Sequence, residues 1–282
     1  MKRILRSLLF VPGGSPSKMD KAAGLPADAL ILDWEDAVLP AEKSAARASS
    51  LDFVRNRMPR QPVFLRFNQT GSDAFRADCE TLREFLPDGI VLSKCQSADD
   101  VGRLTAILNE TDPSGHCAIC PLVESPQGLL NAASIAAVSE RVAWVAFGAE
   151  DFSAEMRITR AEDEMEILYA RSVLVTACRA AGKEPIDSPC LNLRDLGVVR
   201  VAAQRARNLG FSGKLAIHPS QVAVLNEMFS PTQGEVNEAR RLVELFSSAQ
   251  SGVAAVEGQM VDEAVARRAR LVLKLAGDVS PK

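Results

Sequence analysis

The chain has no stretch of apolar residues long enough to cross a membrane. A spanning helix needs about 20 such residues, and no run in the 282-residue sequence approaches that. Leu8 to Val11 is apolar after a basic start, but a secretion signal has a core of about 7 to 15 apolar residues. Lysines and arginines are scattered and the formal net charge is -3, which predicts no surface for nucleic acid or anionic membranes. We therefore expect a cytoplasmic protein that binds neither.

Several motifs of cofactor and nucleotide binding are also missing. No Gly-x-Gly-x-x-Gly follows the first predicted strand, and Gly210 to Lys214 lacks the spacing and the Ser or Thr of a Walker loop. Cys117 and Cys120 form the one Cys-x-x-Cys, but alternation along a strand puts them on opposite faces, which suits neither a zinc knuckle nor a redox turn. The six cysteines therefore predict reduced, mostly buried thiols in a reducing compartment.

Strand-like runs alternate with helical segments along most of the chain. Several runs are continuously apolar, as expected for strands covered on both faces. Eight such units predict an α/β fold, a (β/α)8 TIM barrel, rather than an open doubly wound sheet. The predicted strands are Ser7 to Gly13, Ala29 to Asp36, Pro62 to Asn68, Gly89 to Lys94, His116 to Ser125, Val142 to Gly148, Glu184 to Cys190 and Gly213 to Pro219.

Helix-start signals lie between these runs. Ser72, Ser97 and Ser220 each precede apolar residues at helical spacing, which predicts N-caps. Thr232 with Glu235 three residues later predicts a capping box.

The chain continues beyond the last predicted strand and its helix. Ala254 to Asp262 predicts a small hairpin around Glu257-Gly258, and Glu263 to Leu275 predicts a final helix. We expect a barrel domain over residues 1–246 and a C-terminal hairpin-plus-helix lid over 247–282.

Nearly every predicted strand ends in a charged or polar group. Active sites of such barrels lie at the carboxyl ends of the strands, and burying charges there is costly unless they are paired or bind something. The residues are Asp33, Glu35, Asp36, Arg66, Asn68, Lys94, Glu124, Asp151, Asp187 and His218.

Glu124 and Asp151 follow two successive predicted strands. If those strands are parallel neighbours, both carboxylates face the same opening, which makes the pair our candidate metal site. The alternatives are that Glu124 favours a helix dipole and that Asp151 caps a turn.

The candidate catalytic residues are Arg66, Asp262, Glu35 and Asp36. We expect Glu35 and Asp36 to act as partners of Arg66 or Lys94 beside the metal, with direct metal ligation as the less favoured alternative. His218 is expected to be structural or to contact substrate. Asp262, between the hairpin and the last helix, is either an N-cap or a catalytic residue if the lid closes over the barrel.

The motifs resemble the citrate lyase beta subunit and malyl-CoA or citramalyl-CoA lyase family, within the HpcH/HpaI aldolase superfamily. The resemblance spans nearly the whole chain, in a specific order and spacing. It rests on LLFVPGGSPSKMDKA at Leu8 to Ala22, LDWEDAV at Leu32 to Val38, FLRFN at Phe64 to Asn68, Lys94, PLVESPQGLLNA at Pro121 to Ala132, FGAEDF at Phe147 to Phe152, and GFSGKLAIHPSQV at Gly210 to Val222.

The resemblance implies roles for individual residues. Glu124 and Asp151 would be the ligands of one Mg2+, and Arg66 would hold the substrate beside it. Asp262 would be an acidic lid residue that reaches the active site of a neighbouring subunit, in a homotrimer or a multiple of one. The expected substrate and coenzyme A contacts are Arg66, Pro12, Gly13, Lys18, Lys21, Lys94 and His218.

The function implied is Mg2+-dependent cleavage of a carbon-carbon bond in a short 3-hydroxyacyl-CoA such as citramalyl-CoA or malyl-CoA. The products would be an oxo-acid and an acyl-CoA. Two alternatives stay open, namely an acyl-CoA thioesterase of the same family and a citrate-lyase-type beta subunit that acts on a carrier-protein thioester. The chain departs from the family at Ser17 and Lys18, where an arginine is common, and at Ser93-Lys94-Cys95, where Pro-Lys-Val is usual.

Overall fold

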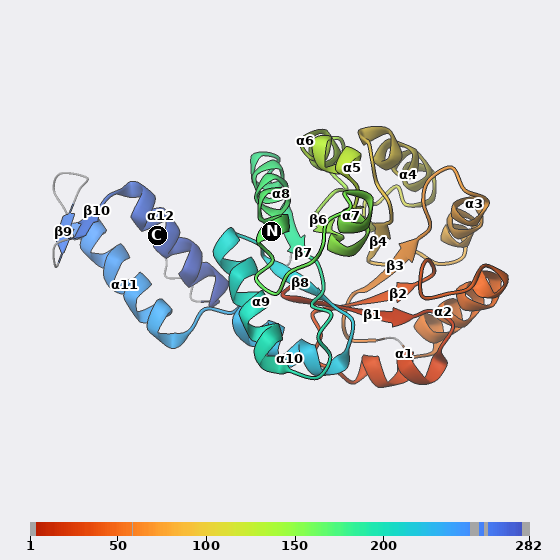
Figure 1. Ribbon diagram of the computed structural model, residues 1–282, viewed down its shortest axis with the longest axis horizontal. Coiled ribbons are helices and arrows are strands. Elements are labelled where there is room, and N and C mark those ends of the chain that lie inside the picture. Colours follow the sequence, from red (N-terminus) through yellow and green to blue (C-terminus); the bar gives the residue numbers. More distant parts are fainter. Residues whose placement is uncertain (1–3, 58, 249–253, 257–258, 278–282) are drawn as a thin grey trace. The chain divides into compact units, whose positions relative to one another are not determined.

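Eight parallel strands close into a barrel in the computed structural model, which describes residues 4–57, 59–248, 254–256 and 259–277 (Figure 1). The strand order follows the sequence, and the first strand pairs with both the second and the eighth. This confirms the predicted (β/α)8 TIM barrel. The strands are β1 (Ser7–Pro12), β2 (Ala29–Asp33), β3 (Val63–Phe67), β4 (Gly89–Leu92), β5 (Ala118–Val123), β6 (Trp144–Phe147), β7 (Glu184–Asp187) and β8 (Gly213–Ala216).

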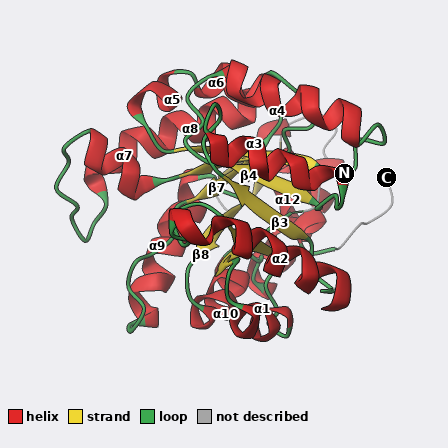
Figure 2. Cartoon of the chain, turned by 90° about the vertical axis from the view of Figure 1, so that its right-hand side faces the viewer, coloured by secondary structure: helices red, strands yellow, loops and turns green. Residues whose placement is uncertain are grey.

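Helices surround the barrel strands (Figure 2). Their sequence bounds are α1 (Pro16–Ala23), α2 (Lys43–Arg57), α3 (Asp73–Glu80), α4 (Ala98–Thr111), α5 (Pro126–Leu130), α6 (Ala132–Ala137), α7 (Ala149–Glu155), α8 (Leu168–Ala180), α9 (Leu196–Leu209) and α10 (Pro219–Met228), with 3-10 turns η1 (Pro40–Glu42), η2 (Thr81–Arg83) and η3 (Met165–Ile167). No helix in the described ranges is long and apolar enough to span a membrane.

The barrel interior is filled by side chains, because branched and aromatic residues from alternate positions of the strands point inward. Phe64 of β3 and Trp144 of β6 meet edge to face across it, with ring centroids 5.5 Å apart. Ile31, Val91 and Ile186 belong to the same buried cluster. This packed floor places the functional groups above it, where the strands end.

Two of the predicted serine caps are present and one is not. The Ser72 hydroxyl accepts a hydrogen bond from the N–H of Phe75, and Ser97 forms a reciprocal capping box at the start of α4. The predicted box at Thr232 and Glu235 is also present. The prediction for Ser220 was wrong, because α10 begins at Pro219 and the Ser220 hydroxyl contacts the ring of His218. Proline is well suited to a first helical position, since the missing N–H would be unbonded there anyway.

The described thiols agree with the sequence-based expectation. All six cysteines are free, five of them are buried, and Cys190 is half-buried. Burial raises the pKa of Cys120 and Cys178 above that of an exposed thiol, so neither is a reactive thiolate.

The chain divides into two compact units, residues 1–226 and 227–282. The second unit holds α11 (Gln233–Ser248), the antiparallel strands β9 (Ala254–Val256) and β10 (Gln259–Val261), and α12 (Glu263–Leu275). The two helices pack through Val236, Ala239, Ala269 and Leu273.

The C-terminal hairpin and last helix are therefore present as predicted, while the turn residues Glu257-Gly258 lie outside the described residues. The division differs from the expected boundary after residue 246. Helix α11, which we assigned to the barrel, shares its apolar face with α12 instead. A helical period shows that a face is apolar but not which element will cover it.

Candidate active site at the carboxyl ends of the strands

A cavity of about 280 Å3 opens where the barrel strands end. Acidic and basic groups line one part of it, and apolar side chains line the rest. Its position matches the catalytic face of (β/α)8 barrels. The lining residues are Phe10, Pro12, Asp33, Ala37, Arg66, Leu122, Glu124, Gly148, Ala149, Glu150, Asp151, Pro189, Leu215 and Ile217.

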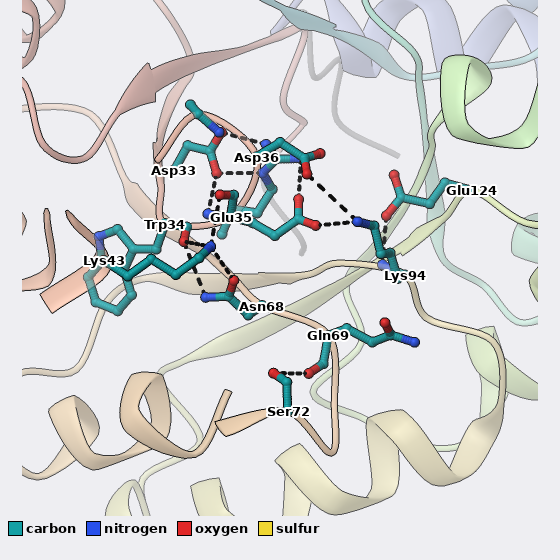
Figure 3. Close-up of polar contacts among 12 residues, drawn as sticks. Asp33, Trp34, Glu35, Asp36, Lys43, Asn68, Gln69, Ser72, Lys94 and Glu124 are labelled. Carbon is teal, nitrogen blue, oxygen red and sulfur yellow. Dashed lines mark hydrogen bonds and ion pairs between the residues drawn. The ribbon is translucent and has the colours of Figure 1, made fainter. Parts of the chain in front are cut away.

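Glu124 follows β5 and is only 4% exposed. Its Oε1 accepts a hydrogen bond of 2.6 Å from the backbone N–H of Lys94, at the end of the neighbouring strand β4 (Figure 3). Gly148 leaves room for this side chain, since a Cβ there would lie 2.5 Å from Glu124 Cβ and 2.7 Å from Oε2. The glycine between β6 and α7 is thus required by the carboxylate beside it.

Burial raises the pKa of Glu124 to about 8, and the negative charges of Asp151 and Glu35 add to the rise. The Lys94 N–H and the charge of Arg66 oppose it without cancelling it. A carboxylate that is buried next to a second carboxylate and lacks a full counter-charge is stabilised in its ionised form by a bound cation. The Glu124 environment therefore fits a cation site.

Asp151 lies in the first turn of α7, exposed to the cavity. Together the two carboxylates supply hard oxygen donors from the ends of the adjacent strands β5 and β6. The described residues contain no cluster of three or more His, Cys, Asp or Glu side chains with metal-binding geometry. A cation held here by two carboxylates would complete its shell with water and substrate oxygens, the usual arrangement for Mg2+.

Arg66 in β3 is held in one orientation. Its Nε and one terminal nitrogen lie 2.7 and 2.5 Å from the two carboxylate oxygens of Asp33, and the other terminal nitrogen lies 3.0 Å from Glu35 Oε2. The guanidinium also lies over the ring of Phe10, 4.9 Å from its centroid. Burial alone would lower the pKa of Arg66, but the paired carboxylates raise it above the usual value, so the group stays charged.

Glu35 lies between two cations, with Arg66 3.0 Å from its Oε2 and the Nζ of Lys94 2.8 Å from its Oε1. Figure 3 shows the contact with Lys94. Asp36 lies at the edge of the same cluster, 3.4 Å from Arg66 and 3.7 Å from Lys94. The pairing that we expected from the sequence is therefore present. Burial raises the pKa of Glu35 despite these cations. Burial also acts to raise the pKa of Asp36, but the hydrogen bond with Glu35 and the charges of Arg66, Lys94 and Lys43 together outweigh it and lower that pKa.

Lys94 has a left-handed backbone, with φ of +51°. This conformation is uncommon for a residue other than glycine. It lets one residue hold two carboxylates, because the backbone N–H points to Glu124 while the ammonium reaches Glu35. The lysine thus ties the acidic cluster after β2 to the candidate metal ligand after β5.

Lys43 is a site residue that sequence reasoning missed. Its ammonium donates to the carbonyls of Trp34 and Glu35 at 2.8 and 2.9 Å and to Asn68 Oδ1 at 2.6 Å (Figure 3). It therefore fixes the loop that carries Glu35. No spacing in the sequence indicates this role, since Lys43 lies at the start of α2 among other charged residues.

Some of the expected site residues lie elsewhere. Lys18 and Lys21 are exposed on α1 and His218 is exposed before α10, and none of the three is among the described residues that line the cavity. Gly13 is buried against Trp34. Asp262 is the N-cap of α12 in the second unit, where its side chain accepts the Val265 N–H at 2.9 Å.

Asp187, one of the charged groups at the predicted strand ends, does not line the cavity. Its carboxylate is fully buried and binds Arg171 of α8, at 3.0 and 2.8 Å, as well as Lys214 of β8. Neighbouring strands and the covering helix supply its counter-charges, so it belongs to the barrel wall.

Comparison with known proteins identifies the family of the chain. Residues 6–219 match the family model described as HpcH/HpaI aldolase/citrate lyase. The chain is 33% identical over 284 residues to the citrate lyase subunit beta of Leuconostoc mesenteroides subsp. cremoris, covering 98% of this chain and 94% of that protein. It is 32% identical over 267 residues to a (3S)-malyl-CoA thioesterase of Cereibacter sphaeroides, covering 91% and 89%.

The fold also matches a solved structure. The Mycobacterium tuberculosis protein CitE, crystallised with magnesium, acetoacetate and coenzyme A, superposes with a TM-score of 0.84 at 30% identity, covering 98% of this chain and 100% of that one. The chain is thus an enzyme that belongs to the HpcH/HpaI aldolase/citrate lyase family.

Proposed function

We propose that the protein is a Mg2+-dependent lyase that cleaves a carbon-carbon bond in a short 3-hydroxyacyl-CoA such as citramalyl-CoA or malyl-CoA. The observation that carries this proposal is the buried carboxylate of Glu124, which lines one small cavity with Asp151 and the oriented guanidinium of Arg66. The complex of CitE with magnesium, acetoacetate and coenzyme A supports the choice of metal and of thioester.

Glu124 and Asp151 would hold the ion. When bound, Mg2+ supplies electrostatic stabilisation for negative charge that develops on substrate oxygens. Without a cation, burial favours the protonated form of Glu124 at neutral pH. A bound cation would instead stabilise the ionised carboxylate that metal binding requires.

In the proposed reaction a base takes the proton of the 3-hydroxyl group, and the bond between the hydroxyl carbon and the carbon next to the thioester breaks. The hydroxyl carbon becomes the carbonyl of an oxo-acid, and the bonding electrons pass to the thioester as an enolate. A proton then adds to the enolate carbon and gives the acyl-CoA. Atoms and charge balance without a redox partner.

Arg66 is suited to bind negative charge in this reaction. It is permanently charged, and two contacts with Asp33 fix its guanidinium group before substrate binds. Little conformational entropy of this side chain is therefore lost on binding. Glu35 and Asp36 then act on the reaction by fixing Arg66 and Lys94. The apolar wall, with Phe10, provides a surface for the carbon skeleton of the acyl group.

The remaining roles extend the family resemblance. Pro12, which lines the cavity, and Gly13, Lys18, Lys21, Lys94 and His218 are proposed substrate or coenzyme A contacts. Asp262, from the lid of a neighbouring subunit in a cytoplasmic homotrimer or a multiple of one, is the proposed proton-transfer residue. Asp262 is half-buried, and its Oδ1 accepts the Val265 N–H. The proposed role therefore requires Oδ2 to face the neighbouring subunit.

Two alternatives have specific support. Resemblance to a malyl-CoA thioesterase favours hydrolysis of the thioester at the same site. Resemblance to citrate lyase subunit beta favours action on a carrier-protein thioester inside a larger complex.

Turnover of malyl-, citramalyl- and citryl-CoA with and without Mg2+, with mass spectrometry of the products, separates these functions. An oxo-acid plus an acyl-CoA identifies the lyase, and a hydroxy-acid plus free coenzyme A identifies the thioesterase. Glu124→Ala and Asp151→Ala are expected to abolish Mg2+-dependent turnover. Glu84→Gln, which alters an exposed ion pair outside the cavity, is the matched control. Full activity of either metal-site variant would refute the proposed site.

A further inference from the structure

A chain of ion pairs begins in the barrel wall beneath the cavity. Asp187 at the end of β7 binds both Lys214 of β8 and Arg171 of α8, and all three side chains are at most 2% exposed. Two parallel contacts of 3.0 and 2.8 Å fix the guanidinium of Arg171 against the carboxylate. A buried pair of this geometry is costly to break, so it serves as a rigid anchor.

Glu164 extends this anchor into the loop after α7. Its Oε2 lies 3.0 Å from the free terminal nitrogen of Arg171, and its Oε1 lies 3.6 Å from Arg160. The backbone of Glu164 is left-handed, with φ of +56°. A left-handed residue with a side chain costs about 1 kcal/mol or more and persists where its surroundings hold it. Here the two arginines that share its carboxylate supply that restraint.

Arg160 connects the loop to the candidate metal site. Besides Glu164 it contacts Glu166 at 2.9 Å and Glu150 at 3.0 Å. Glu150 immediately precedes Asp151 in the first turn of α7, and both line the cavity. Within the described part of the chain, Asp151 makes no hydrogen bond or ion pair through its own side chain. Its position therefore depends on the backbone of a helix of only seven residues, which has little stability by itself.

We propose that Arg160 is a positioning residue for the metal pair. Through Glu150 it fixes the first turn of α7, and it also keeps the Glu150 carboxylate directed away from the cation that Asp151 is to bind. The ion-pair chain from Lys214 to Glu150 thus couples the barrel wall to one of the two ligands. This inference depends on the proposed Mg2+ site.

Calorimetric titration of Mg2+ into the wild-type chain, Arg160→Gln, Arg160→Lys, Glu150→Gln and the Arg160→Gln/Glu150→Gln double variant tests the proposal. Removing a direct partner of a metal ligand typically weakens metal binding by about 10- to 100-fold, and because Arg160 contacts Glu150 and not Asp151 itself, we expect a loss at the lower end, of about 10-fold. We expect that loss in Arg160→Gln and in Glu150→Gln, with the double variant no weaker than the worse single one, because both break the same contact. Arg160→Lys should recover part of the affinity. In turnover assays Arg160→Gln should raise the Mg2+ concentration that gives half-maximal rate. This fold-change should be larger than the fold-decrease in the rate at saturating Mg2+.

Arg55→Gln is the matched control, since it removes an arginine from an exposed ion pair with Glu84 and should leave Mg2+ binding unchanged. Mg2+ affinities of Arg160→Gln and Glu150→Gln within about threefold of the wild type, or losses that multiply in the double variant, would overturn the positioning role. Absence of Mg2+ binding by the wild-type chain would instead overturn the proposed function itself.

Discussion

Glu124 makes the stability of the metal-free protein depend on pH in a way that one substitution removes. The group has an ordinary pKa of 4.5 when unfolded and about 8 in the folded chain, chiefly because it is buried. Each pKa unit corresponds to about 1.4 kcal/mol, so ionised Glu124 costs the folded state about 5 kcal/mol. In Glu124→Gln that cost is absent, while the amide oxygen still accepts the Lys94 N–H.

The pH dependence of the free energy of unfolding follows from the number of protons that Glu124 binds in each state. Below about pH 4.5 the carboxyl group is protonated in both states and contributes no difference. Between about pH 4.5 and 8 the unfolded chain has released the proton and the folded chain retains it, so the free energy of unfolding falls as pH rises. Above about pH 8 both states are ionised and the full cost is present. Glu124→Gln should therefore become progressively more stable than the wild type from pH 5 to pH 9.

The assay is urea unfolding in EDTA at pH 5, 7 and 9, followed by tryptophan fluorescence. Both tryptophans, Trp34 and Trp144, are buried in the barrel unit and report its unfolding. Mg2+ at about 100 times its dissociation constant should stabilise the wild type by about 2.7 kcal/mol at pH 8 and leave Glu124→Gln unchanged. A stability difference between the two proteins that stays constant from pH 5 to pH 9 would refute the reasoning.

Three further predictions concern other parts of the site. Gly148→Ala should destabilise the protein by about 1 to 3 kcal/mol and weaken Mg2+ binding, because the new methyl group would overlap Glu124; thermal unfolding and calorimetry measure both, and an unchanged affinity would contradict it. Arg66→Lys should lower kcat/KM by about 100-fold, because a single ammonium cannot replace the planar guanidinium group that Asp33 orients. A kcat/KM within threefold of the wild type would count against the role of Arg66. Asp187→Asn should cost about 3 to 5 kcal/mol in urea unfolding, since it leaves two buried cations without their shared counter-charge; a cost below about 1 kcal/mol would refute that account.

The sequence by itself was sufficient for the architecture and for the candidate metal pair. Continuous apolar runs at regular spacing imply parallel strands covered on both faces, and the carboxyl ends of such strands meet on one side of a barrel. The sequence therefore predicts that Glu124 and Asp151 face one opening, and both line the same cavity. The local caps at Ser72 and Ser97 were also predictable, because a cap involves groups only three residues apart.

Only the tertiary structure decided how the charges pair. Arg66 contacts Asp33 across 33 positions of sequence, Lys43 reaches Asn68 across 25, and Lys94 joins Glu35 to Glu124 through its ammonium and its backbone N–H. Asp187 follows a strand as the site residues do, but Lys214 and Arg171 enclose its carboxylate. The physical reason is that a charge at the end of a strand is equally recognisable in sequence whether it faces a cavity or a counter-ion. Packing of neighbouring strands and helices determines which of the two it meets.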